Sequence, residues 1–233
     1  LPILNTKKLF IWLLYLIAPL VSIAQESTQY PTDYLSPAFH AGRRAAFREK
    51  LSANGVGIFF ASQVRVRNND VDYQYAQSKN FYYFTGLEES DAMLLLFKQP
   101  VTILNKTVTE FIFVKNRDPQ KELWTGKILG VEGVKARYKM ENVFTNDQFT
   151  ASTIDFTTID SVFSAYRNEG IFSKYKRVED PLSHMANIVD SIINTQNKPI
   201  AARSTQMILS SLRGIKQPEE IALIAKEIGR AHV

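Results

Sequence analysis

Short apolar runs recur along the first half of the chain at lengths typical of strands. The runs at 56–61, 92–97 and 110–114 are continuous rather than alternating, which is typical of strands buried on both faces of a sheet. The aromatic segment 81–85 ends at Gly86, and its composition predicts a further strand. Four strands in this part of the chain indicate a sheet at the centre of the fold.

Helical patterns precede and follow these runs. Ser36 and Pro37 supply an N-cap and a proline in the first turn, which predicts a helix that stops at Asn54-Gly55. The second half predicts helices at 133–140, 159–166, 181–195 and 205–212, a strand at 171–172, and a last helix that opens at 217–221. The order predicts an α/β fold, with a central mixed β-sheet flanked by helices.

Residues 1–24 have the pattern of a signal peptide. A basic pair precedes an apolar run of 16 residues that ends in small residues, so we expect cleavage between Ala24 and Gln25. The alternative is a membrane anchor, but a spanning helix needs roughly 20 apolar residues. We therefore expect an exported protein, periplasmic or extracellular, in which residues 25–35 form a polar leader.

The last six residues, 228–233, match what one frame of a widely used sequencing adapter would encode. Gly229 is also expected to break the helix that precedes it. We interpret these residues as translated adapter sequence and do not consider His232 as a ligand or base. The alternative is a genuine carboxyl-terminal tail.

The composition is that of an ordinary folded protein, with 233 residues of which 45% are hydrophobic and 22% charged. The net charge of +5 falls to +3 when the two lysines of the signal are removed (5 − 2). An excess this small and dispersed argues against a nucleic-acid-binding protein. The absence of cysteine excludes disulfides, a cysteine nucleophile and thiolate metal sites.

No self-contained active site is evident in the sequence. The motifs of zinc peptidases, serine hydrolases and P-loop proteins are missing. Asp70 and Asp72 share a face only if their segment is extended, and beside two asparagines an acidic turn is the favoured interpretation. His40 and His184 lack a second ligand at metal-binding spacing, so we expect surface or packing roles for both.

A resemblance to a known family rests on several stretches taken together. They are Arg67 to Tyr75, Gln77 to Leu87, Arg117 to Pro119, Glu122 to Gly126 and Gly214 to Ile221. The first four closely resemble the amino-terminal domain of Xaa-Pro aminopeptidase, also called aminopeptidase P. The last resembles the linker and opening helix that lead into the catalytic domain of that family. The resemblance implies an amino-terminal domain at 36–213, followed at 214–227 by the first helix of the catalytic domain.

The resemblance implies a creatinase-type amino-terminal domain and, for the full-length parent, hydrolysis of the bond between an amino-terminal residue and a following proline. Its substrates are then peptides with proline at the second position. In the family, two divalent metal ions, usually manganese, are held by a carboxyl-terminal pita-bread domain. The amino-terminal domain caps the substrate and builds a homo-oligomer, a dimer or tetramer. This chain is thus expected to bind no metal or cofactor and to be inactive alone.

Two residues are candidates for contact with the substrate cleft or a neighbouring subunit. Asp70 matches an acidic residue near the substrate end of the cleft in the family. Trp124 matches a tryptophan that reaches toward the active site of an adjacent subunit. A carboxylate suits a substrate ammonium, and an indole suits a proline ring. Trp124 could instead anchor its own loop.

Two alternatives stay open at this stage. The chain could be the amino-terminal part of a prolidase, which cleaves dipeptides, although the segment from Asn69 through Gly86 favours the aminopeptidase. It could also be a stand-alone, non-catalytic domain that binds a partner or dimerises in the cell envelope.

Overall fold

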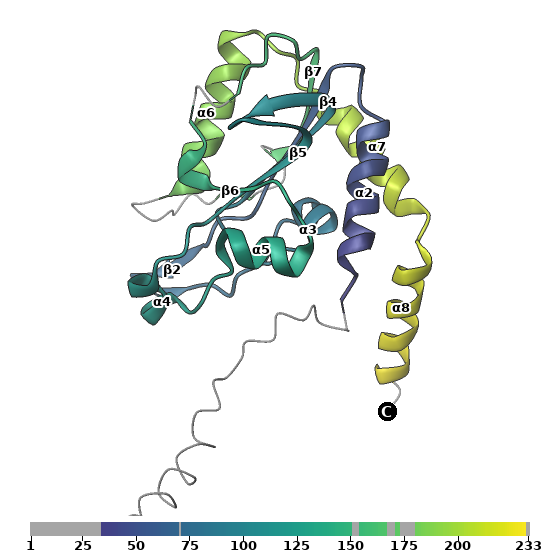
Figure 1. Cartoon of the computed structure of the whole chain (residues 1–233). Coiled ribbons are helices and arrows are strands. Elements are labelled where there is room, and N and C mark those ends of the chain that lie inside the picture. Colours follow the sequence, from purple (N-terminus) through teal and green to yellow (C-terminus); the bar gives the residue numbers. More distant parts are fainter. Residues whose placement is uncertain (1–33, 70, 151–153, 167–170, 173–179, 232–233) are drawn as a thin grey trace, which may run out of the picture.

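The chain forms three layers, with helices on both faces of one sheet, as the computed structural model in Figure 1 shows. The structure describes residues 34–69, 71–150, 154–166, 171–172 and 180–231. The middle layer is a five-stranded sheet in the order β6-β5-β4-β1-β7. Its strands are β1 (Gly55–Phe60), β4 (Met93–Ile103), β5 (Lys106–Val114), β6 (Val143–Thr145) and β7 (Ser161–Phe163).

The sheet is mixed, as the sequence predicts. Strand β1 pairs in parallel with β7, and β5 pairs in parallel with β6, whereas β4 lies antiparallel between β1 and β5. Four strands therefore point in one direction and β4 points in the other. As a result the carboxyl ends of β1, β5 and β6 lie at the same edge of the sheet as the amino end of β4.

Both faces of the sheet are buried, which explains the continuous apolar runs. Ile58 and Leu95 face the core beneath α6, and Phe59 and Leu94 face the opposite core. One face is covered by α6 (Pro181–Thr195), and the other by α2 (Pro37–Glu49), α3 (Lys79–Thr85), α5 (Gly130–Tyr138) and α7 (Ala202–Gly214).

Smaller elements lie around these layers. They are the hairpin β2 (Val66–Asn68) and β3 (Val71–Asp72), the short helix α4 (Pro119–Thr125), a 3₁₀ turn (Asn146–Gln148) and α8 (Pro218–Ala231). The hairpin and α4 lie at the same end of the molecule, beyond the sheet, and α8 starts near the amino end of α2 and extends away from the layers (Figure 1).

Local sequence signals explain the elements that the sequence predicts correctly. Ser36 caps α2 by accepting a hydrogen bond from the Phe39 backbone N–H at 3.2 Å, and Pro37 occupies its first turn. Leu104 and Asn105 both have positive φ, the geometry that a tight turn between β4 and β5 needs. Helix α6 occupies the predicted range 181–195.

The prediction of a strand at 81–85 is wrong. This segment is helix α3, capped by the Ser78 side chain, which accepts from the Phe81 N–H, and ended by Gly86 in the left-handed conformation. Its aromatic residues have high strand propensity, but the two caps and the buried positions of Phe81 and Phe84 favour a short helix instead.

Three further predictions are corrected. Most of the helix predicted at 159–166 is replaced by strand β7, because Val162 completes the sheet beside β1. Residues 171–172 form no strand, although the Ile171 carbonyl accepts the Gln63 N–H at 3.0 Å. Gly229 does not end the last helix, since α8 runs to Ala231.

The two histidines in the described part have packing and surface roles, as expected. His40 is fully buried, and its Nδ1 donates to the Tyr83 carbonyl at 2.9 Å. His184 is exposed on α6. No helix within the described ranges has the length and apolar character needed to cross a membrane.

Candidate functional site

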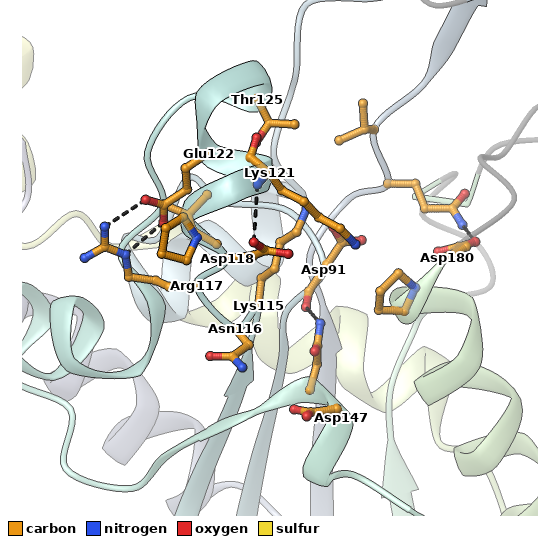
Figure 2. Close-up of a pocket in the computed structure, with 16 residues that line it drawn as sticks. Asp91, Lys115, Asn116, Arg117, Asp118, Lys121, Glu122, Thr125, Asp147 and Asp180 are labelled. Atoms are coloured by element: carbon orange, nitrogen blue, oxygen red, sulfur yellow. Dashed lines mark hydrogen bonds and ion pairs between the residues drawn. The ribbon is translucent and has the colours of Figure 1, made fainter.

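An open pocket of about 640 Å³ lies at the edge where the carboxyl ends of β1, β5 and β6 meet (Figure 2). Ligands of α/β folds commonly bind outside this end of a sheet. Segments next to the strand ends line it: Gln63 and Val64 after β1, Lys115 to Asp118 after β5, Asn146 and Asp147 after β6, and Asp91 before β4, and all of these residues except Val64 are polar. Helix α4 and the start of α6 complete the wall.

The floor of the pocket is held by hydrogen bonds between loops. The Gln63 side chain donates to Asp180 and, at 2.9 Å, to the Ser183 hydroxyl, while Asp180 caps α6 by accepting the Ser183 N–H. Asn146 donates to the Asp91 carbonyl at 3.1 Å. The first bonds join the segment after β1 to the start of α6, and the last joins the end of β6 to the segment before β4, so much of the polar lining is hydrogen-bonded to its neighbours.

Both signs of charge line the pocket. Lys115 pairs loosely with Asp91 at 3.5 Å. Arg117 donates two hydrogen bonds of 2.8 Å to the Glu122 carboxylate, and these bonds hold the pKa of Glu122 below its usual range. Asp147 adds a further carboxylate. Such a lining suits a ligand that carries both an ammonium and polar backbone groups more than an apolar one.

Helix α4 presents two exposed apolar side chains beside the pocket. Asp118 caps the helix by accepting the N–H groups of Gln120 at 3.0 Å and Lys121 at 3.3 Å, and Gly126 ends it with φ of 82°. Trp124 is 90% exposed and Leu123 is 82% exposed. The helix is therefore well anchored through its polar side, while its two largest apolar side chains face solvent.

The loop before α4 packs closely on the first residue of α5. Gly130 has φ of 60°, and a Cβ placed on it would lie 2.6 Å from the Arg117 side chain. A glycine is needed here because any larger residue would displace Arg117 and, with it, the ion pair to Glu122.

The family model for the aminopeptidase P amino-terminal domain matches residues 40–160 of this chain, which is 121 of its 233 residues. The chain belongs to the aminopeptidase P amino-terminal domain family. The matched region contains the sheet from β1 to β6, the β2–β3 hairpin and α4, and so it includes most of the pocket wall.

The curated relatives of this chain include Xaa-Pro aminopeptidases. The one from Haemophilus influenzae is 31% identical over 107 residues, covering 46% of this chain and 24% of that protein. The one from Escherichia coli is 24% identical over 188 residues, covering 79% of this chain and 40% of that protein. A solved structure of Escherichia coli aminopeptidase P, its low-pH form, has the same fold, with a TM-score of 0.62 and 22% identity over 81% of this chain and 41% of that one. The chain thus spans less than half the length of these relatives.

The structure brings one of the two predicted site residues into view. Trp124 lies on α4, and its neighbour Thr125 lines the pocket. Asp70 lies outside the described residues, between the described ends of β2 and β3. Both remain predictions as contact residues. Val71 in β3 and Tyr73 directly after it are exposed, at 52% and 55%.

Sequence reasoning did not single out Asp91, Lys115 or Asp147, which line the pocket. The signal was present, since each is a charged residue near the end of a strand, but only the parallel order of β1, β5 and β6 brings these ends together. Within the described ranges, no group of three or more histidine, aspartate and glutamate side chains is arranged to hold a metal ion.

Proposed function

We propose that this chain is the substrate-capping and oligomerisation domain of an exported Xaa-Pro aminopeptidase. The full-length enzyme removes an amino-terminal residue that precedes proline. The family membership and the activity named for the curated relatives support this proposal. The basic and apolar pattern of residues 1–24 supports export.

Exposed Trp124 is the observation that carries the proposal. A tryptophan and a leucine that are 90% and 82% exposed on one rigid helix form the type of anchor that is typically buried when two protein surfaces meet. We propose that Trp124 enters the active-site cleft of a neighbouring subunit. Its flat indole offers a packing surface for a proline ring.

A cleft closed by a side chain of a neighbouring subunit suits the reaction. The bond before proline is a tertiary amide without an N–H, so an enzyme that cleaves it has to recognise the proline ring itself. Exclusion of bulkier residues by a second subunit would supply part of that recognition. The acidic groups of the pocket rim, with Asp70, would attract the substrate ammonium.

The described residues do not fit a dinuclear metal site. On this proposal, two divalent ions, usually manganese in the family, are held by a part of the longer protein that this chain does not cover. The chain alone is then inactive, and its contribution to catalysis is binding and orientation.

A paired peptidase assay tests the proposal. The full-length gene product and the 233-residue chain are each incubated with Ala-Pro-Ala and Ala-Ala-Ala, with manganese or with a chelator. We expect release of alanine from Ala-Pro-Ala only, by the full-length protein only, and loss of activity with the chelator. Light scattering should show a dimer or tetramer. Activity of the short chain, or an inactive full-length protein, would contradict the proposal.

A further inference from the structure

Glu89 is a partly buried carboxylate in the segment that joins α3 to β4. Its Oε1 accepts the backbone N–H of Leu129 at 2.7 Å, at the start of α5. Its Oε2 is buried and has no hydrogen-bond partner among the described residues. Burial raises the pKa of Glu89, although Lys115 and Arg137 act in the opposite direction. Burial of a carboxylate costs free energy, so the position of Glu89 beside Leu129 calls for a structural reason.

Gln77 lies before α3, on the other side of that helix in the sequence from Glu89, and makes five hydrogen bonds through one amide group. Its Oε1 accepts from the Ser62 N–H at 2.8 Å, the Tyr75 hydroxyl at 2.9 Å and the Ser78 N–H at 2.9 Å. Its Nε2 donates to the carbonyls of Leu87 at 3.0 Å and Glu89 at 2.8 Å.

These bonds hold the base of the β2–β3 hairpin. Ser62 precedes the hairpin and Tyr75 follows it, and the Tyr75 hydroxyl also donates to the Ser62 carbonyl at 3.1 Å. The Tyr73 N–H donates to the Arg65 carbonyl at 2.8 Å, which continues the pairing toward the tip. Gln77 thus joins both legs of the hairpin to the backbone of Glu89.

The two residues together form a continuous connection between two loops. It passes from the hairpin legs through the Gln77 amide to the Glu89 backbone, and from the Glu89 carboxylate to Leu129. Leu129 is three residues beyond Gly126, where α4 ends. The connection therefore reaches from the hairpin that contains position 70 to the turn that follows Trp124.

We propose that Gln77 and Glu89 are positioning residues that fix the β2–β3 hairpin and helix α4 relative to each other, so that both enter a neighbouring active site as one unit. The proposal rests on the proposed function for its catalytic consequence. Its structural consequence, an α4 whose orientation depends on Glu89, can be measured without any activity.

The first experiment follows the motion of Trp124. The chain has two tryptophans, Trp12 and Trp124, so the substitution Trp12→Phe leaves Trp124 as the only indole fluorophore. Time-resolved anisotropy is recorded for this protein and for Glu89→Ala, Glu89→Gln and Gln77→Ala made in it. We expect a larger fast-decaying fraction in Glu89→Ala and Gln77→Ala. Glu89→Gln should behave as the parent, because the amide oxygen can still accept the Leu129 N–H.

A matched control is Glu132→Ala on α5, whose exposed side chain pairs with Lys135 at 2.9 Å. It should leave the anisotropy of Trp124 unchanged. If Glu89→Ala does not fold, Glu89→Asp replaces it, because the shorter side chain withdraws the oxygen from Leu129. Unchanged anisotropy in a folded Glu89 variant that has lost the bond, or rapid hydrogen exchange of the Leu129 amide in the parent, would overturn the proposal.

The second experiment is a double-mutant cycle in the full-length enzyme, with kcat/KM for Ala-Pro-Ala as the measured quantity. Glu89→Ala should lower it about tenfold when Trp124 is present and less than about twofold in a Trp124→Ala background. A purely structural role would give equal factors in both backgrounds and would refute positioning. A full-length protein without peptidase activity would refute the proposed function, whereas the anisotropy result would still decide the coupling of the two loops.

Discussion

Trp124 and Leu123 are the two most exposed large apolar side chains among the described residues, at 90% and 82%. A tryptophan that anchors a loop normally buries its ring, and burial of a large aromatic side chain stabilises a fold by several kcal/mol. The anchoring of α4 is instead polar, through Asp118 and the Arg117–Glu122 ion pair. The side chain of Trp124 is therefore available for another surface.

Substitution of Trp124 separates these two roles. Trp124→Ala should change the free energy of unfolding by less than about 0.5 kcal/mol, because little of the ring is buried. Phe84→Ala, at a fully buried position, should cost about 3–5 kcal/mol. Urea denaturation of the 233-residue chain measures both. A loss above about 1 kcal/mol in Trp124→Ala would show that the residue anchors its loop.

At the scale of the element, α3 shows where sequence patterns are insufficient. Its aromatic run has the composition of a strand, and the decisive features are the Ser78 cap and the left-handed Gly86, which the pattern of hydrophobic residues does not weigh. Strand β7 is wrongly predicted as a helix for another reason. It becomes a strand by pairing with β1, about a hundred residues away in the sequence, and a local pattern does not contain that contact. The strands β1, β4 and β5 and the helix α6 are predictable because their patterns are local and strong.

The candidate site is less predictable than the fold. Trp124 was found through the resemblance, and its exposure is visible only in the structure. Asp91, Lys115 and Asp147 come from three separate segments, and only the order of the strands places them around one pocket. No local pattern in a single sequence carries that information.

Helix α2 is attached to the sheet by an ion-pair cluster that gives a second prediction. Arg44 and Arg48 bond to the Glu110 carboxylate of β5 at 3.0 Å and 2.6 Å. Burial alone would raise the pKa of Glu110, but the two arginines outweigh it and lower the pKa. Glu110→Gln should therefore cost about 2–3 kcal/mol at neutral pH, because two guanidinium groups lose their charge partner.

The sign of the pKa shift sets the pH dependence of that cost. A folded-state pKa below the unfolded value stabilises the protein above that unfolded value, near 4.5, and the stabilisation is lost as the pH falls through the folded pKa. The difference in unfolding free energy between the parent and Glu110→Gln should thus shrink below about pH 4.5. Glu132→Gln, at an exposed pair, should cost less than about 0.5 kcal/mol at any pH. A difference that stays constant with pH would contradict this account of Glu110.

At the scale of the whole molecule, α8 is joined to the layers mainly at its first turn. The Glu219 carboxylate accepts from the Ser36 N–H and, at 2.9 Å, from the Ser36 hydroxyl, so α8 starts beside the amino end of α2. Beyond that turn, Ile221, Ile224 and Ile228 are exposed at 55%, 46% and 56% along one side of the helix. An amphipathic helix with an uncovered apolar stripe promotes self-association.

Two changes to α8 test this stripe. Deletion of residues 217–233 should raise the soluble concentration of the chain, and Ile221→Ser with Ile224→Ser should do the same while keeping the contact between Glu219 and Ser36. The double substitution should leave the unfolding free energy within about 0.5 kcal/mol, because both side chains are half exposed. The control Leu209→Ser, at a buried position of α7, should instead destabilise the chain and increase light scattering. If neither change to α8 reduces light scattering, the apolar stripe is covered in solution. The expected domain boundary at residue 213 would then be misplaced, because α8 would pack on the amino-terminal domain.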